Sequence, residues 1–111
     1  MKYLILVRNL LLPFTASVFI CISTASYAQG DRTAGSEKAR HCQVCHGVGG
    51  RSTNATYPIL AGQHSKYIEK QLRAFKTGTR KDPIMNGMAS KLSEQDIEDV
   101  AAYFSSNKQQ K

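Results

Sequence analysis

The run Cys42-Gln43-Val44-Cys45-His46 determines how the rest of this sequence can fold. Two thiols at this spacing can reach the two vinyl groups on one edge of a haem and form thioether bonds. A histidine directly after the second cysteine is then held under the iron as an axial ligand, so the run is the attachment signature of c-type haem. Because the run occurs once, we expect one covalently bound haem c per chain, anchored by Cys42 and Cys45 and ligated by His46.

Three other uses of the two cysteines compete with haem attachment. A disulfide between them would close a very small loop and restrain the unfolded chain little. A thioredoxin-like redox pair requires a βαβ setting, and the sequence shows no strand-like alternation. A structural zinc site requires four ligands; a second cysteine pair is missing, and His41 directly precedes Cys42, which is not a usual ligand spacing.

Residues 1–28 have the layout of a secretory signal peptide. Lys2 and Arg8 form a short positive region, an apolar run follows, and Ser26-Tyr27-Ala28 supplies small residues two positions apart. We therefore expect cleavage after Ala28, export to the periplasm, and a mature domain of residues 29–111.

A retained membrane anchor is the alternative for the same segment. The apolar run of residues 10–22 is short for a membrane span, and Pro13, Thr15 and Ser17 interrupt it. We expect no stable membrane insertion after cleavage.

The size and charge of the chain limit its class. With 111 residues and a formal net charge of +7 it has room for one small domain. A domain this small buries little apolar surface and usually needs a disulfide, a metal or a cofactor. A covalent haem at the centre of the core meets that need, and binding to nucleic acid is not expected of an exported haem protein.

Periodicity predicts an all-α domain. A short helix is expected over residues 31–41, running into the cysteine motif, and a second from Ser65 as N-cap to a stop at Gly78. A last helix opens at Ser93, with Asp96 in the capping-box position. The tail of residues 107–111, which starts at Asn107, is polar and is expected to fray.

Two stretches between these helices are expected to be irregular, residues 47–64 and residues 79–92. The second carries Met85 and Met88, either of which could supply the sulfur ligand on the other side of the iron, and His64 is a third candidate. Spacing alone does not choose between the methionines. The apolar residues expected to surround the haem are Ile59, Leu60, Ile68, Leu72, Phe75, Ile97, Val100 and Phe104.

The ordered set of residues along the chain resembles the class I c-type cytochromes, and within them one half of the tandem two-haem periplasmic cytochromes. The main matching runs are Cys42-Gln43-Val44-Cys45-His46-Gly47, Tyr57-Pro58-Ile59-Leu60-Ala61-Gly62-Gln63, Gly78-Thr79-Arg80, Met85-Asn86-Gly87-Met88 and Ala101-Ala102-Tyr103-Phe104.

This resemblance implies a class I cytochrome c fold, with three to four short helices around one covalently bound haem. It implies that Met85 is the axial sulfur ligand and that Met88 is a packing residue and the fallback ligand. It further implies that the Pro58 carbonyl accepts the ring N–H of His46, a bond that orients a metal-ligating histidine.

The resemblance also places Gly35 and Tyr103 where the first and last helices cross closely. For function it implies a soluble periplasmic carrier of single electrons in a respiratory chain, with low-spin His/Met haem and no catalysis of its own. The alternatives are the electron-accepting subunit of a periplasmic dehydrogenase or oxidase complex, and a haem-based ligand sensor.

Six basic side chains fall in a short stretch whose one acidic residue is Glu69; they are Lys66, Lys70, Arg73, Lys76, Arg80 and Lys81. They are either a solvated helix face or a docking surface for redox partner proteins, namely an acidic partner or a membrane-bound oxidase or reductase. We expect the carrier to be a monomer.

Overall fold

A computed structural model describes residues 29–109, so the expected signal peptide of residues 1–28 lies outside the described part of the chain. Within residues 29–109 the protein is helical and contains no strand, which confirms the all-α prediction. The elements in chain order are α1 (Arg32–Lys38), α2 (Arg40–His46), the 3₁₀ turn η1 (Val48–Gly50), α3 (Ser65–Thr77), α4 (Pro83–Ser90) and α5 (Glu94–Ser106).

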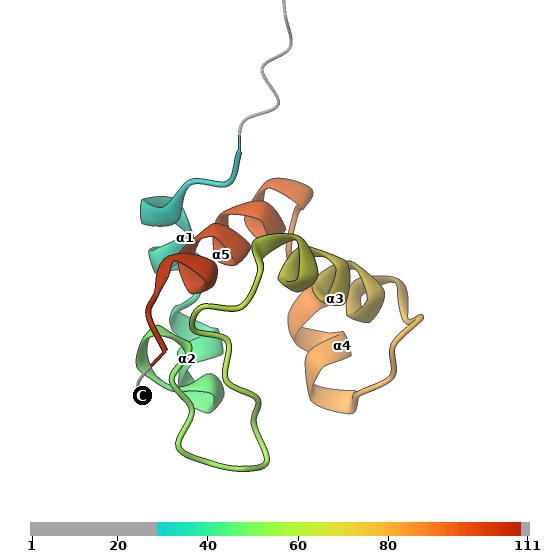
Figure 1. Ribbon diagram of the computed structural model, residues 1–111. Coiled ribbons are helices and arrows are strands. Elements are labelled where there is room, and N and C mark those ends of the chain that lie inside the picture. The colour runs from blue at the N-terminus through green and yellow to red at the C-terminus, as the bar shows by residue number, and fades with distance from the viewer. Residues whose placement is uncertain (1–28, 110–111) are drawn as a thin grey trace, which may run out of the picture.

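The helices are arranged around a cavity that residues of α2, α3, α4 and α5 line. α5 packs against both α1 and α3, and α4 packs against α3. As a result, α2 and α4 lie on opposite sides of the domain (Figure 1). None of the helices within residues 29–109 has the length and apolar content needed to cross a membrane.

The first and last helices cross at Gly35, as the resemblance implies. A Cβ atom at this position would lie 1.9 Å from the carbonyl oxygen of Asp99 and 3.0 Å from the Cβ of Tyr103. Gly30, just before α1, lies equally close to the backbone, because a Cβ there would be 1.9 Å from the carbonyl oxygen of Glu98. Two glycines thus allow the start of the domain to rest directly on the α5 backbone.

A cluster of charged and polar groups holds this crossing together. Asp99 is 2% exposed and accepts hydrogen bonds from the Asp31 amide (2.7 Å), Lys38 Nζ (2.7 Å) and Gln95 Nε2 (2.8 Å). Lys38 also pairs with Asp96 at 2.7 Å. Burial pushes the pKa of Asp99 upward, but the bonds from Lys38 and the Asp31 amide outweigh it and the net pKa is lowered.

The ends of α3 and α5 agree with the sequence patterns except at one residue. Gly78 ends α3 in the left-handed conformation at φ 77°, and Ser93 with Asp96 forms a capping box at the start of α5. The prediction of Ser65 as an N-cap is wrong. His64 occupies the N-cap position without a capping side-chain bond, and Ser65 is the first helical residue.

The prediction that residues 79–92 are irregular is wrong, because α4 occupies the middle of this stretch. Asp82 caps the helix, and its Oδ1 accepts from the amides of Ile84 (2.9 Å) and Met85 (2.8 Å). Pro83 occupies the first turn, where its missing N–H costs nothing. Asp followed by Pro is the local signal that predicts this helix.

The single helix expected over residues 31–41 is also divided. Ala39 separates α1 from α2, and α2 carries the cysteine motif itself. The tail does not fray at its beginning, because Asn107 is buried and its Nδ2 donates to the Gly49 carbonyl oxygen at 3.1 Å.

The buried apolar core lies between α3 and α5. Of the residues expected to surround the haem, Ile68, Leu72, Phe75, Ile97, Val100 and Phe104 are buried. Leu60 is partly buried against this core, and Ile59 is 53% exposed.

Replacement of Gly35 by Ala tests the close crossing. The added methyl would meet backbone atoms that cannot rotate away, so we expect the free energy of unfolding to fall by about 2 kcal/mol or more. Gly87→Ala is the matched control, because a Cβ at Gly87 would meet nothing within 4 Å in the middle of α4. It should gain about 0.5 to 1 kcal/mol. Urea denaturation of both variants measures the difference, and equal stability of the two would contradict the crossing.

The pH dependence of stability tests the two pairings of Lys38, with Asp96 and with the buried Asp99. The hydrogen bond from Lys38, followed by that from the Ser93 amide, lowers the pKa of Asp96 from 3.8 to about 2. A carboxylate whose pKa is lowered in the folded state contributes stability above its unfolded pKa and loses it as the pH falls through the folded value. Unfolding free energies measured between pH 5 and pH 2 should therefore fall more steeply in the native protein than in Lys38→Met. Parallel curves would show that neither pairing of Lys38 contributes to stability.

Candidate functional site

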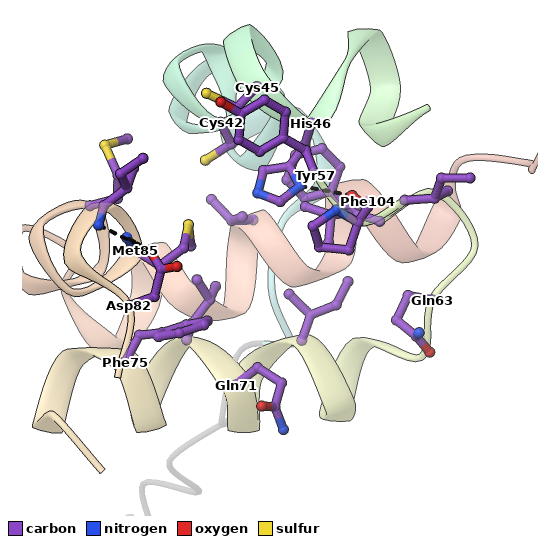
Figure 2. A pocket seen from close by; sticks show the side chains of 18 of the residues that line it. Cys42, Cys45, His46, Tyr57, Gln63, Gln71, Phe75, Asp82, Met85 and Phe104 are labelled. Carbon is purple, nitrogen blue, oxygen red and sulfur yellow. Dashed lines mark hydrogen bonds between the residues drawn. The ribbon is translucent and has the colours of Figure 1, made fainter. Parts of the chain in front are cut away.

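A cavity of about 520 Å³ opens between α2, the loop after η1, α3 and α4. This volume is within the range of cofactor pockets in proteins. Figure 2 shows the labelled side chains entering it from several elements, with Cys42, Cys45 and His46 on the α2 side and Met85 on the α4 side. The cavity brings together almost every site residue expected from the sequence.

α2 presents the cysteine motif to the cavity. Cys42, Cys45 and His46 are three and four positions apart, so a helix places them on one face, and all three line the cavity. Both thiols are free within the described residues. Burial raises the pKa of the Cys42 thiol, and the neighbouring Cys45 acts in the same direction.

His46 is held in one orientation. It is 7% exposed, and its Nδ1 lies 2.8 Å from the carbonyl oxygen of Pro58, which can only accept. The ring proton is therefore on Nδ1, and Nε2 keeps its lone pair for a metal ion. This is the contact that the family resemblance implies between His46 and Pro58.

A backbone turn places Pro58 where this bond can form. Gly47 ends α2 at φ 79°, and Gly50 ends the 3₁₀ turn at the same angle. The Gly50 carbonyl then accepts from the amides of Leu60 (2.8 Å) and Ala61 (3.1 Å). The loop is thereby pinned next to the cysteine motif.

Both candidate methionines lie on α4 and line the cavity. Met85 and Met88 are three positions apart, so they share a helix face. Asn86 fastens this helix to α3, because its Nδ2 donates to the carbonyl oxygens of Phe75 (2.7 Å) and Arg80 (2.8 Å). The sulfur atoms are thus carried by an anchored helix and not by a loop.

His64, the third candidate ligand, stands apart from the cavity. It is an exposed residue at the start of α3 and does not line the pocket. His41 does line it, beside Cys42.

Sequence reasoning missed the polar residues of the cavity wall. Arg80 was expected on a basic face, yet it lines the cavity, donates from Nη1 to Gln71 Oε1 at 2.6 Å, and stacks its guanidinium 4.5 Å from the Phe75 ring centre. Asp82 lines the cavity as well as capping α4. In the sequence, only the family resemblance singled out the run Gly78-Thr79-Arg80 as a candidate part of the site.

The basic face is smaller than the sequence suggests. Arg73 pairs with Glu69 (3.2 Å), Glu94 (2.7 Å) and Glu98 (3.6 Å), and its pKa is raised chiefly by Glu94. Lys76 approaches Glu94 at 4.0 Å and donates to a backbone carbonyl. Lys66 pairs with Glu69 at 3.0 Å. Of the six basic residues, those outside any ion pair of the described chain are Lys70, Arg80 and Lys81.

The residues of the cavity fit a c-type haem. The apolar wall suits a porphyrin, the two free thiols suit thioether bonds to its vinyl groups, and the oriented imidazole suits the iron. A sulfur ligand is available from α4.

Comparison with known proteins agrees with this fit. The sequence profile of the family "Cytochrome c" matches residues 33–108. The crystal structure of reduced recombinant cytochrome c4 from Pseudomonas stutzeri superposes with a TM-score of 0.70 at 46% identity, over 73% of this chain and 47% of that one.

Two further relatives differ in length. Cytochrome c-554(548) of Halomonas halodenitrificans is 42% identical over 80 residues, which are 69% of this chain and 96% of the relative. The thiosulfate dehydrogenase electron acceptor of Thiomonas intermedia is 36% identical over 106 residues, which are 95% of this chain and 46% of the relative. The chain spans about half the length of the cytochromes c4 that it matches.

Proposed function

Because the chain belongs to the cytochrome c family, we propose that it is a one-electron carrier whose single haem c is ligated by His46 and Met85. Members of this family bind their haem covalently and are electron carriers and not enzymes. In the proposal Cys42 and Cys45 form the thioether bonds. The observation that carries it is the shared cavity, which joins the cysteine motif of α2 to the methionines of α4.

A bound haem supplies an iron that takes up and releases one electron by cycling between the ferric and ferrous states. The chain's own residues control that site. The Pro58 carbonyl fixes the His46 ring and makes it a more basic ligand. Buried apolar side chains such as Leu72 and Phe104 limit water in the cavity, which raises the reduction potential.

We assign Met85, not Met88, as the sulfur ligand. Met85 lies in the first turn of α4, where the amide bond to Asp82 fixes its backbone. The family resemblance gives the same assignment. Met88 then packs against the cofactor as an apolar neighbour.

In this proposal electrons would leave near Cys42 and Cys45, the residues that would hold the edge of the haem. Val44 (83% exposed) and Val48 (80% exposed) are two of the most exposed large apolar side chains, and both lie within three residues of these cysteines in the sequence. An apolar contact near the cysteines, together with basic groups such as Lys70 elsewhere on the surface, suits a redox partner with an acidic face. The charges would mainly raise the rate at which the two proteins associate. The proposal also includes export to the periplasm through the signal peptide of residues 1–28, a respiratory role and a monomeric state.

Service as the electron-accepting partner of a dehydrogenase is the second candidate, favoured by the similarity to a thiosulfate dehydrogenase electron acceptor. Co-purification of the tagged chain with a larger catalytic subunit would support this role. A free monomer that exchanges electrons rapidly in bimolecular reactions would favour the independent carrier.

The two methionines can be separated by optical spectroscopy. We expect the sulfur-to-iron charge-transfer band of the oxidised protein to be absent in Met85→Ala and present in Met88→Ala. The midpoint potential should fall markedly only in Met85→Ala, because a sulfur ligand raises it. A band that survives in Met85→Ala would refute the ligand assignment, and a native protein without the band would favour a ligand sensor.

The thioether bonds can be tested by extraction of the denatured protein with acidified organic solvent. The haem should stay with the native chain and with either single variant, Cys42→Ser or Cys45→Ser, because one thioether bond is enough to retain it. The double variant should release its haem completely. Release of haem from the native chain would exclude covalent attachment.

A further inference from the structure

Gln43 lies inside the cysteine motif but does not line the cavity. Its Oε1 accepts a hydrogen bond from the Gly49 amide at 2.7 Å and a second from the Tyr103 hydroxyl at 3.2 Å. A backbone amide can only donate, so the oxygen of the Gln43 carboxamide must be the atom that faces it. The side chain of Gln43 is therefore bound to the turn η1 and to α5.

Gly49 receives a side-chain contact on each of its backbone polar groups. It is buried in η1, with φ 66° in the left-handed region, inside a turn that otherwise follows a 3₁₀ path. Its amide donates to Gln43 Oε1, and its carbonyl oxygen accepts from Asn107 Nδ2 at 3.1 Å. A buried amide that loses its acceptor is destabilising, so the turn requires an acceptor from the residue at position 43.

The loop of residues 49–58 is joined to the last turns of α2 at both of its ends. Gln43 holds the Gly49 amide at one end, and at the other end His46 Nδ1 lies 2.8 Å from the Pro58 carbonyl oxygen. Gln43 and His46 are three positions apart on α2, so one face of the helix carries both contacts. Residues 51–57 between them contain no helix or strand.

The turn that Gln43 holds is also connected to the residues just after Pro58. The Gly50 carbonyl oxygen accepts from the amides of Leu60 (2.8 Å) and Ala61 (3.1 Å). A displacement of the turn would therefore move the Pro58 carbonyl relative to the His46 ring.

We propose that Gln43 is a positioning residue for His46: it holds the Gly49 amide, keeps the Pro58 carbonyl within bonding distance of the imidazole, and so helps to set the reduction potential of the iron. The inference rests on the proposed function. A bond from the ring N–H to a carbonyl makes the imidazole a more basic ligand. A more basic ligand favours the ferric form, so a weaker bond raises the potential.

The chemistry of the motif allows this role to be isolated. Haem attachment requires the two cysteines and the histidine, and it does not specify the two residues between the cysteines. Gln43→Ala removes the acceptor, whereas Gln43→Glu keeps an oxygen at the same distance along the side chain. Val44→Ala is the matched control within the motif, because Val44 is 83% exposed.

Midpoint potentials of the haem-containing protein, measured by optical redox titration, give the first test. We expect Gln43→Ala to raise the equilibrium constant of reduction about threefold, which is about 28 mV for one electron. Val44→Ala and Tyr103→Phe should stay close to the native value, because both keep the bond to Gly49. A general loosening of the site would admit water and lower the potential, so the sign separates positioning from damage.

Proton exchange, followed by NMR on the reduced protein, gives the second test. In Gln43→Ala the Gly49 amide and the His46 ring proton should both exchange about tenfold faster, because both contacts of the loop are loosened. Gln43→Glu should retain the native rates. The amide of the fully buried Phe104 should exchange at the native rate in every variant, which shows that the domain as a whole has not opened.

An unchanged or lowered potential in Gln43→Ala would overturn the proposal. So would fast exchange at Gly49 with native exchange at His46, which would make Gln43 a support of the turn alone. An equal rise in Tyr103→Phe would place the effect at α5 and would also overturn it. The charge-transfer band, recorded on the same samples, tests the His46/Met85 ligation separately, and its absence from the native protein would leave the comparison of exchange rates valid.

Discussion

The hydrogen bond between His46 and the Pro58 carbonyl oxygen is the contact on which the site depends. It joins the last residue of α2 to the loop that follows η1 and lines the cavity. The bond sets the tautomer of the imidazole, and the covalent chain sets its distance from Cys45. The Gly50 carbonyl oxygen also holds this loop in place, because it accepts hydrogen bonds from the amides of residues 60 and 61. Removal of either constraint would leave the histidine free to rotate.

The α1–α5 crossing supports this contact from behind. Gly35 allows α1 to rest on the α5 backbone, and the buried carboxylate of Asp99 gathers the bonds that hold it there. Only one residue separates α1 from α2, so the α1–α5 crossing also determines where the cysteine motif lies. Val100 and Phe104 of the same α5 line the cavity, so one helix serves the polar cluster on one face and the cofactor on another.

Features that depend on contacts between neighbouring residues could be predicted from the sequence, whereas features that depend on contacts between distant residues could not. The cysteine motif, the capping box at Ser93 and the stop at Gly78 are local, and each was predicted from a few neighbouring residues. The signal for the start of α4, Asp82 followed by Pro83, was equally local, but Pro83 and Gly87 also favour a loop. Its docking could not be predicted, because it depends on Asn86 bonding to carbonyls at the end of α3.

The basic residues show the same limit most clearly. In the sequence, Arg73 and Arg80 look alike, since both belong to the basic stretch of residues 66–81, which has few acids. In the structure, the first turns of α5 bring acidic groups to Arg73, so that its charge stabilises the packing of α3 on α5. Arg80 lies beyond the turn at Gly78, out of reach of those acids, and faces the cavity. The division between structural and site-forming cations is therefore made by the chain reversal and not by the residue type, and a count of charges along the chain cannot detect it.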